Sequence, residues 1–336
     1  MINIALDVMG GDHAPENVLE GAFLAVQKLP VKITLVGNEE IITPLLVDRA
    51  DWPNDRLTIC HAPETISMSE TPSVAFRKKK KSSIHVGLNL VKESLADGFV
   101  SAGNTGAVLT ASMIILRNIE NIERPAIATV LPGKHGPVVM LDMGSNVDCK
   151  PIHLVQFAIM GKYFAELLLG IPNPKIGILN IGEEEDKGDI LTQTAHNMLK
   201  EMPINFKGNI EGKDILTNKV DVITCDGFVG NSVLKFGESI SELFVDFFKS
   251  EAKNSFFSKA GLLLLKPALN RFKKSYDYAA YGGAPLLGLN GVSVIAHGKS
   301  SPLAIKNAIK SAYDAVESDM VNKIAGAVAE EMLHDR

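Results

Sequence analysis

Cysteine and long apolar runs are scarce in this sequence of 336 residues. Its three cysteines, Cys60, Cys149 and Cys225, show no C-x-x-C spacing, so the sequence indicates neither a disulfide framework nor a zinc site. No apolar run reaches the roughly 20 residues that a membrane-spanning helix needs. The N-terminus begins directly on a strand-like run, without a basic segment followed by an apolar one. We therefore expect no secretory signal and a cytoplasmic location.

Three motifs of cofactor binding and nucleophilic catalysis are also missing. The dinucleotide fingerprint G-x-G-x-x-G follows none of the predicted strands, and the phosphate-loop pattern G-x-x-x-x-G-K-[ST] does not occur. The G-x-S-x-G elbow of serine hydrolases is absent too. These absences argue against a nicotinamide dehydrogenase, a phosphate-loop nucleotide enzyme and a serine acyl-enzyme, and we expect no cofactor and no metal. The formal charge of −5 argues against a general nucleic-acid binder.

The sequence does contain a regular alternation of strand-like and helical patterns. This alternation predicts an α/β fold with a mostly parallel, doubly wound sheet, and we expect a single catalytic domain over 1–336. The runs 126–131 and 138–142, separated by a segment with two prolines and two glycines, predict a hairpin instead. The predicted strands are 2–8, 31–36, 56–60, 98–101, 126–131, 137–142, 175–181, 204–209, 219–225 and 291–296, and the predicted helices are 15–28, 39–50, 83–96, 104–116, 151–169, 189–201, 229–250 and 301–334.

The stretch from Val220 to Asn231 is the most informative one. An apolar run of strand length ends in a loop of small residues, and a long amphipathic pattern follows directly, which predicts a strand, a glycine turn and a helix. The first amides of such a helix lack partners within the helix, and its dipole is positive at this end, so a phosphate or a developing oxyanion fits there. Asp226 and Asn231 are placed to orient this ligand.

Three other predicted strands end in similar loops. If these loops converge at the edge of the sheet, they form a cleft rich in backbone donors. The alternative is that turns between strands and helices need glycine in any case. For the set as a whole we favour a functional role. The loops are Val8–Pro15, Ala102–Gly106 and Met143–Asn146.

A second polar cluster follows the predicted strand 175–181. Four consecutive acidic residues, 183–186, precede Lys187. A divalent metal is one reading of the acids, but consecutive side chains do not all face one point. Lys187 should keep its charge among acids, and it could neutralise a phosphate or an oxyanion. The alternative is that Lys187 forms an ordinary surface ion pair.

Two histidines lie in loops that follow strands. His13 comes after the first glycine turn, and His297 follows the last predicted strand. Either is a candidate general acid or base. A structural role is the alternative for a single loop histidine, and we place both in the site as lining residues more than as essential ones.

The segment 244–281 departs from the alternating pattern, because Phe247, Phe248, Phe256, Phe257 and 262–265 are interleaved with basic residues. An apolar stripe beside a basic face suits a helix that lies on an anionic membrane. A helical arm packed against a second subunit is an equal alternative, and the two can hold together.

The run from Arg77 to Lys81 contains five consecutive basic residues. A solvated loop is its ordinary explanation. The alternative is a docking patch whose charge speeds the arrival of an acidic partner.

The motifs together closely resemble the bacterial phosphate acyltransferases of phospholipid synthesis, the PlsX family. The resemblance covers the chain nearly from end to end. The matching segments are Ala5–Asp12, Val100–Ala107, Ile122–Ala126, Asn146–Cys149, Leu154–Gly161, Leu179–Glu185, Cys225–Asn231, Leu286–Leu289 and Ala296–Gly298.

This resemblance implies transfer of a fatty acyl group from acyl carrier protein to inorganic phosphate, which yields acyl phosphate. It also implies a fold like that of isocitrate and isopropylmalate dehydrogenases and phosphotransacetylases, a homodimer, and peripheral attachment to the membrane, where a glycerol-3-phosphate acyltransferase would take up the product. A phosphotransacetylase that uses acyl-coenzyme A and a membrane-attached scaffold that binds the carrier without turnover are the rival readings.

From both lines of argument we predict catalytic and substrate-binding residues. The predicted catalytic residues are Lys187, Asn180, Asp226 and His13. The predicted substrate-binding residues are Asp7, Gly10, Gly11, Asp12, Gly103, Asn104, Thr105, Gly106, Asn146, Glu183, Gly227, Phe228, Gly230, Asn231, His297 and Gly298.

Overall fold

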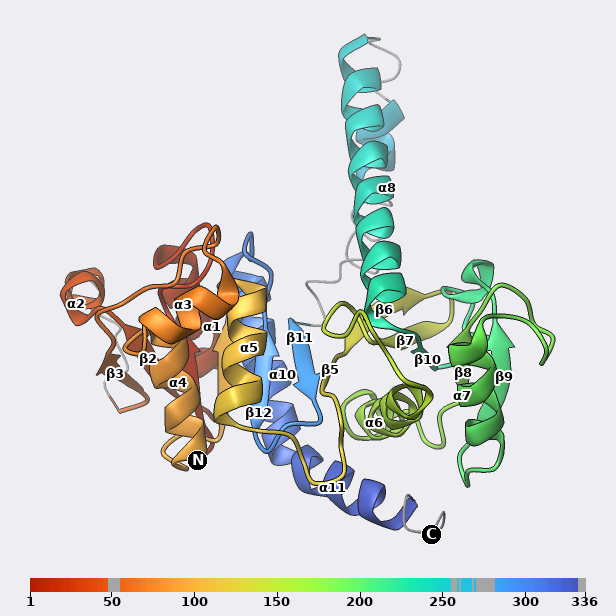
Figure 1. Ribbon diagram of the computed structural model, residues 1–336. Coiled ribbons are helices and arrows are strands. Elements are labelled where there is room, and N and C mark those ends of the chain that lie inside the picture. The colour runs from red at the N-terminus through yellow and green to blue at the C-terminus, as the bar shows by residue number, and fades with distance from the viewer. Residues whose placement is uncertain (48–54, 255–258, 260, 268, 270–281, 332–336) are drawn as a thin grey trace.

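The computed structural model describes residues 1–47, 55–254, 259, 261–267, 269 and 282–331. Within them the chain forms two neighbouring sheets with helices packed around them (Figure 1). Most strand pairs in both sheets are parallel. The predicted α/β class is therefore confirmed, with the strands divided over two sheets instead of one.

The first sheet combines the N-terminal strands with the last two strands of the chain. Its described strands run in the order β3-β2-β1-β4-β12-β11-β5. The pairs β2–β1, β1–β4 and β4–β12 are parallel, so the carboxyl ends of these strands share one edge. Its strands are β1 (Asn3–Asp7), β2 (Lys32–Gly37), β3 (Leu57–His61), β4 (Gly98–Ser101), β5 (Ala126–Ile127), β11 (Ala284–Leu287) and β12 (Val292–Ile295). The central strands β4 and β12 are buried along their full length, as expected where helices cover both faces.

The second sheet has the order β6-β7-β10-β8-β9 in the described residues. β10 pairs in parallel with β7 and with β8, which again brings three carboxyl ends to one edge. β6 and β7 form an antiparallel hairpin, so the predicted hairpin is confirmed. Its strands are β6 (Thr129–Gly133), β7 (Gly136–Leu141), β8 (Ile176–Leu179), β9 (Phe206–Ile210) and β10 (Val222–Thr224).

One extended segment passes from the first sheet to the second. β5 pairs with β11 in the first sheet, and β6, which begins at Thr129, pairs with β7 in the second. At this crossing the amide of Ile127 donates to the Asp142 carboxylate at 3.0 Å, and the amide of Met143 donates to the Ile127 carbonyl at 3.1 Å. The two sheets are therefore connected by hydrogen bonds as well as by the chain.

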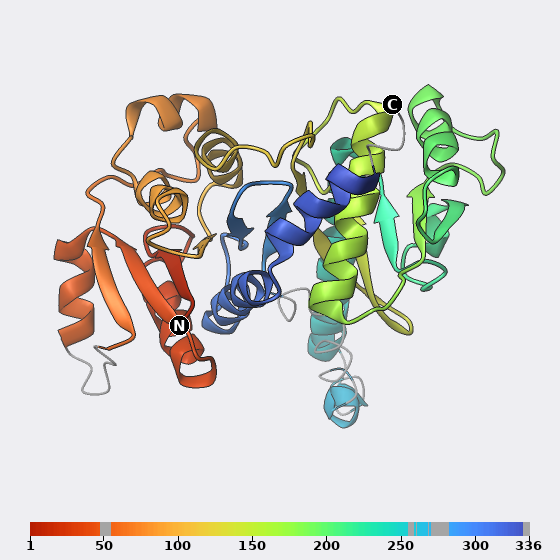
Figure 2. The ribbon, with the colours of Figure 1, turned by 90° about the horizontal axis from the view of Figure 1, so that it is seen from below.

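Helices cover both sheets, and the buried apolar core is continuous from one sheet to the other. α11 crosses from the first sheet and packs against α6 of the second (Figure 2). The helices are α1 (Glu16–Lys28), α2 (Glu39–Val47), α3 (Pro72–Lys78), α4 (Ser83–Lys92), α5 (Thr105–Ile115), α6 (Pro151–Leu169), α7 (Ile190–Lys200), α8 (Gly227–Asn254), α10 (Pro302–Glu317) and α11 (Met320–Glu331), with a short 3₁₀ turn at Gly212–Asp214.

α6 is the one described helix that is long and apolar enough to cross a membrane by length and composition. However, 61% of its most apolar window is buried inside the protein, where it packs against β7, β10, α7 and α11. Its apolar character is therefore that of a core helix.

Three parts of the predicted element pattern are wrong. The single helix expected over 301–334 is divided into α10 and α11, because Asp319 adopts a left-handed conformation with φ of 54° between them. The short strand β11 and the helix α3 lie in stretches without a predicted element. The start of the basic run at Arg77 is therefore the last turn of a helix, where positive charge is favoured by the helix dipole.

α8 is one continuous helix of 28 residues that protrudes from the second sheet (Figure 1). Every side chain over 239–250 is exposed. The predicted arm 244–281 thus begins inside this helix, and residues 261–267 are helical as well. The rest of the expected arm, except for residues 259 and 269, lies outside the described residues from 255 onward.

Candidate functional site

Asp7 lies beneath the loops that follow β1 and β4. Its side chain is 1% exposed; one carboxylate oxygen accepts from the Met9 amide at 3.1 Å, and the other accepts from the Ser101 hydroxyl at 2.6 Å. The Ser101 hydroxyl accepts in turn from the Gly103 amide at 3.0 Å. Burial raises the pKa of Asp7, although these hydrogen bonds oppose the rise. Asp7 therefore holds the backbone of two loops from below.

Gly10 is pressed against this buried carboxylate. A Cβ atom at Gly10 would lie 2.5 Å from an Asp7 oxygen and 2.7 Å from the Gly103 nitrogen, so no larger residue fits. Gly11 has φ of 114°, in the region that favours glycine, and the amide of Asp12 donates to the Gly298 carbonyl at 2.8 Å. The glycines thus bring the loops after β1, β4 and β12 into contact with one another.

Asn104 caps α5 and fastens a neighbouring loop to it. Its side-chain oxygen accepts from the Ala107 amide at 3.1 Å, while its side-chain nitrogen donates to three carbonyl groups within 67–70. In the described residues, the amides of Thr105 and Gly106 have no hydrogen-bond acceptor. The first turn of α5 therefore keeps two donors available at the positive end of the helix.

Among the predicted residues at this edge, those with exposed side chains are Asp12, His13, Thr105 and His297. The ring of His297 accepts at Nδ1 from the Lys299 amide at 3.1 Å, which shapes the loop after β12. All four side chains lie on the loops that the buried Asp7 and the glycine contacts bring together.

Asp142 occupies the equivalent position under the loops of the second sheet. It is fully buried and accepts from the Ser145 hydroxyl at 2.6 Å, the Asn146 amide at 2.6 Å and the Asn146 side chain at 2.9 Å. The Asn146 side chain also donates to the Pro125 carbonyl at 2.7 Å. Asn146, predicted to bind substrate, is thus 8% exposed, and its side-chain nitrogen is engaged in holding the loop to Asp142 and Pro125.

The start of α8 is pressed against the same carboxylate. A Cβ atom at Gly227 would lie 2.7 Å from an Asp142 oxygen, and the Gly227 amide donates to the Asn146 carbonyl at 2.7 Å. Asp226 accepts from the Val229 amide at 2.9 Å and caps the helix. Because a carboxylate already occupies this helix end, we expect α8 to attract an anion less strongly than α5 does.

The remaining predicted residues of the first two turns of α8 divide into buried and exposed positions. Gly230 is buried against the backbone of Asp142, whereas Phe228 and Asn231 are exposed. Phe228 therefore presents an aromatic ring to solvent at the edge where the strands end.

Lys187 is carried by the loop after β8. Asn180 shapes this loop, because its side-chain nitrogen donates to the Lys187 carbonyl at 3.1 Å and its oxygen accepts from the Ile181 amide at 2.8 Å. The loop ends at Asp189, which caps α7 by accepting from the Thr192 amide at 2.8 Å. The side chain of Lys187 is exposed.

The acidic neighbours of Lys187 are paired with other lysines. Glu183 contacts Lys219 at 2.8 Å, and Glu185 contacts Lys200 at 2.9 Å. The hydrogen bond that Lys200 donates lowers the pKa of Glu185, and the hydrogen bond that Lys219 donates to Glu183 raises the pKa of Lys219. Lys187 itself forms no ion pair with any described residue. Its charge is therefore left for a ligand, and the alternative of an ordinary surface pair is not what this structure has.

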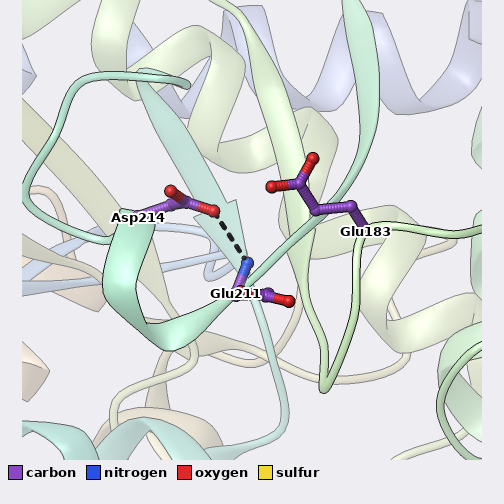
Figure 3. A group of neighbouring side chains, drawn as sticks. All are labelled: Glu183, Glu211 and Asp214. Carbon is purple, nitrogen blue, oxygen red and sulfur yellow. Dashed lines mark hydrogen bonds between the residues drawn. The ribbon is translucent and has the colours of Figure 1, made fainter.

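Glu183 also belongs to the one group of described carboxylates close enough to hold a metal ion. Its oxygen lies within 4.8 Å of oxygens from Glu211 and Asp214, and the Glu211 amide donates to Asp214 at 3.2 Å (Figure 3). Lys219 lies 2.8 Å from Glu183 and 3.6 Å from Asp214, and Lys213 pairs with Glu211. With two lysines among three carboxylates, the cluster is already largely neutralised.

The predicted residues thus fall into two groups rather than one ring. The loops after β1, β4 and β12 form the first group at the edge of the first sheet, and the loops after β7, β10 and β8 form the second group. Among the described residues, no hydrogen bond or ion pair joins a predicted residue of one group to one of the other. The expectation that all loops meet at one sheet edge is corrected to two edges.

The sequence analysis did not predict the residues that hold the loops from beneath, nor those that pair with the acidic residues around Lys187. Ser101 and Asp142 organise the two loop groups, and Lys219 and Lys200 neutralise the acids around Lys187. Asp142 had a usable signal, since it ends a strand just before a glycine loop, as Asp7 does. The two lysines had none, because they lie on other elements.

Comparisons with known proteins identify the family to which the chain belongs. The family model described as "Fatty acid synthesis protein" matches residues 2–323. A phosphate acyltransferase from Heliobacterium modesticaldum is 50% identical over 323 residues, which are 96% of each chain. One from Aquifex aeolicus is 49% identical over 324 residues, again with 96% of each chain covered.

The fold is shared with more distant proteins. A crystal structure of a phosphotransacetylase from Streptococcus pyogenes aligns with a TM-score of 0.64 at 17% identity and covers 94% of each chain. At this identity the likeness shows the arrangement of elements alone.

Proposed function

This chain belongs to the fatty acid synthesis protein family, together with its phosphate acyltransferase relatives, and we propose that it transfers a fatty acyl group to inorganic phosphate. The product is an acyl phosphate for phospholipid synthesis. Membership of this family makes the protein an enzyme of the transferase class rather than a scaffold.

The observation that supports this reaction best is the unpaired charge of Lys187. An acyl transfer develops negative charge on the carbonyl oxygen, and a fixed cation at that point stabilises it. The other lysines that contact the acidic loop form ion pairs: Lys219 lies 2.8 Å from Glu183, and Lys200 lies 2.9 Å from Glu185. Lys187 alone in this loop can meet the oxyanion without first breaking an ion pair.

We place the phosphate at the first turn of α5. The free amides of Thr105 and Gly106 and the positive end of the helix suit a phosphate group. The buried Asp7 and Ser101 fix the loops on either side, so the donors are held in place before the ligand arrives. His13, Asp12 and His297 line the approach.

The proposed reaction is a direct displacement. A phosphate oxygen attacks the thioester carbonyl carbon, Lys187 stabilises the tetrahedral oxyanion, and the carbon–sulfur bond breaks as the thiolate leaves. A preorganised donor of this kind contributes about 3 kcal/mol. This reaction requires the phosphate at α5 and the thioester at Lys187 to meet between the two loop groups, and holding both there would remove much of the entropic cost of the bimolecular step. The step needs no metal and no nucleotide.

Acyl carrier protein is the proposed acyl donor, and the exposed basic residues around α3 form its proposed docking surface. Lys79 is excluded from this surface, because it pairs with Glu70 at 2.6 Å and donates to the Thr65 carbonyl at 2.7 Å. Arg77, Lys78, Lys80 and Lys81 are exposed and remain available to an acidic partner.

Measuring acyl phosphate from purified protein, phosphate and two donors tests the proposal. We expect phosphate-dependent product with acyl carrier protein and much slower turnover with acyl-coenzyme A. Charge reversal at Lys80 and Lys81 should raise the KM for the carrier, while reversal of the exposed Lys32 on the first sheet should not. Equal use of acyl-coenzyme A would favour the phosphotransacetylase alternative, and thiol release without phosphate would rule out the reaction.

We further propose a homodimer formed through α8. Phe236, Ile240, Leu243, Phe244 and Phe247 repeat at helical spacing and are all exposed in one chain. An isolated helix in water is only marginally stable, so a second copy packed on this stripe would stabilise it. Light scattering should give the mass of two chains for the wild type and of one chain for Leu243→Glu. Glu242→Lys, on the polar face, should stay dimeric.

Peripheral attachment to the membrane is the proposed role of the arm beyond α8. Leu263, Leu264 and Leu265 are exposed in a helical segment, and Lys259 and Lys266 beside them are exposed too. Flotation with anionic vesicles should carry the wild type upward, and replacement of residues 262–265 by serine should abolish this. Unchanged flotation of a still dimeric variant would restrict the arm to a role between subunits.

A further inference from the structure

Four large apolar side chains stand exposed at the carboxyl edge of the second sheet. Val147 is 63% exposed, Ile181 81%, Ile190 83% and Phe228 65%. Outside this edge, the rest of α8 and residues 261–267, only Met1, Val47 and Leu95 among the described large apolar residues exceed 60%. These three are scattered, whereas the four come from the ends of neighbouring strands.

The topology places the four residues at the same edge of the second sheet. β10 lies between β7 and β8, and Leu141, Thr224 and Ile178 are aligned across the three strands. The chain leaves β7 and β8 through loops that carry Val147 and Ile181, and it leaves β10 into α8, whose second residue is Phe228. The contact between Asn180 and the Lys187 carbonyl at 3.1 Å closes the loop after β8 and brings its far end, with Ile190, back to the same edge.

Ile181 and Ile190 flank the loop that carries Lys187, and Val147 and Phe228 follow the neighbouring strands β7 and β10. Leaving large apolar side chains in water is unfavourable by about 1.5–3 kcal/mol each relative to burial, so an apolar ligand is attracted to them. A cation beside an apolar surface matches a molecule with a long hydrocarbon chain and an oxygen-bearing head. The fatty acyl thioester has both features.

We propose that Val147, Ile181, Ile190 and Phe228 form the surface on which the acyl chain lies, and that this surface sets the preference for long chains. The inference rests on the proposed acyl transfer and adds a site for the part of the substrate that takes no part in the chemistry. Binding the chain here directs the carbonyl toward Lys187. Binding energy from this remote part of the substrate then supports the reaction at the head.

The double variant Ile181→Asn with Ile190→Asn tests the surface, because both side chains are exposed and the fold does not depend on them. kcat/KM is measured with butyryl and palmitoyl donors on the same carrier. We expect the palmitoyl value to fall roughly 10-fold or more and the butyryl value to stay within about two-fold, since only the long chain reaches the lost surface. Leu95→Asn, at an apolar position that is 61% exposed and precedes β4 of the first sheet, serves as the matched control and should change neither value.

Three results would overturn the inference. They are an unchanged ratio of palmitoyl to butyryl activity, an equal loss with both donors, and a shift of the variant from dimer to monomer in light scattering. The last would mean that the four side chains form a contact between subunits. A wild type that forms no acyl phosphate from either donor would instead refute the proposed function, and binding of cis-parinaric acid, weaker in the double variant than in the wild type, would then still report on the surface.

Discussion

The loop groups of the two sheets are held by the same arrangement of buried residues, but they leave different chemical groups available to a ligand. In each, a buried aspartate at the end of a strand accepts hydrogen bonds from the following loops, and a glycine is pressed against its carboxylate. Asp7 and Gly10 form this pair in the first sheet, and Asp142 and Gly227 form it in the second. The buried carboxylate is therefore a means of fixing backbone, whichever ligand the loops receive.

The difference lies in what each group leaves unused. The first group leaves the amides of Thr105 and Gly106 open at a helix end, which suits a small anion. The second group closes its helix end with Asp226 and leaves Lys187 and an apolar edge, which suits a thioester. Ligand preference therefore follows from the donors, charges and apolar surface that the loops do not use in their own hydrogen bonds and ion pairs.

Removing the buried carboxylate of Asp142, which holds the loops of the second group, should have the largest effect. Asp142→Ala leaves several buried donors without an acceptor and breaks the contact to Ile127, so we expect a loss of unfolding free energy of roughly 3–5 kcal/mol. Urea denaturation followed by circular dichroism measures this. Asp142→Asn keeps one of the two acceptor oxygens and should lose less than the alanine variant. A cost below about 1 kcal/mol for the alanine variant would contradict the role of Asp142 in holding the second group.

Removing the unpaired cation of the second group, Lys187, should have the next largest effect. Lys187→Ala should lower kcat by roughly 100-fold or more with unfolding free energy unchanged, because it removes an oxyanion donor from an exposed position. Lys200→Ala is the matched control, since this lysine is paired with Glu185 and should change kcat by no more than about two-fold. Similar losses for both lysines would mean that general charge, not the free ammonium, matters.

The open amides of the first group can be removed one at a time. Thr105 is the first residue of α5, where proline keeps the helix but lacks the N–H group. Thr105→Pro should therefore raise the KM for phosphate by about 10-fold and leave the KM for the acyl donor unchanged. Thr105→Ala keeps the amide and should resemble the wild type. A rise in the acyl-donor KM instead would place phosphate in the second group.

The smallest effect concerns the charge of Asp7. Burial raises its pKa above the ordinary value of 3.8, so the folded protein binds this proton more tightly than the unfolded chain. Stability from this residue is then fully present below pH 3.8 and falls as the pH rises through the raised pKa. Asp7→Asn cannot ionise, so we expect its unfolding free energy relative to the wild type to increase from pH 4 to pH 8. A constant difference in urea denaturation would show that the pKa of Asp7 is not raised.

Local patterns were sufficient to predict the glycine loops, the position of Lys187 in the sequence after β8, and the described strands other than β11. Parallel strands have apolar runs that end abruptly, and a helix that follows a glycine turn has a recognisable start. They were insufficient for the division into two sheets, because β5 and β11 are only a few residues long and pair with partners distant in sequence. The choice of Lys187 as the free cation depends on Lys200 and Lys219, whose contacts arise only in the folded chain.

The crossing at Ile127 has a mechanical consequence. The amide and the carbonyl of this one residue both form hydrogen bonds to the residues that follow β7. Swinging the two halves apart would therefore break the hydrogen bond to the buried carboxylate of Asp142. Opening the molecule at this crossing therefore costs free energy. Movement of the surface loops breaks neither of these two hydrogen bonds, so admitting substrate through the loops costs less free energy than rocking one half against the other.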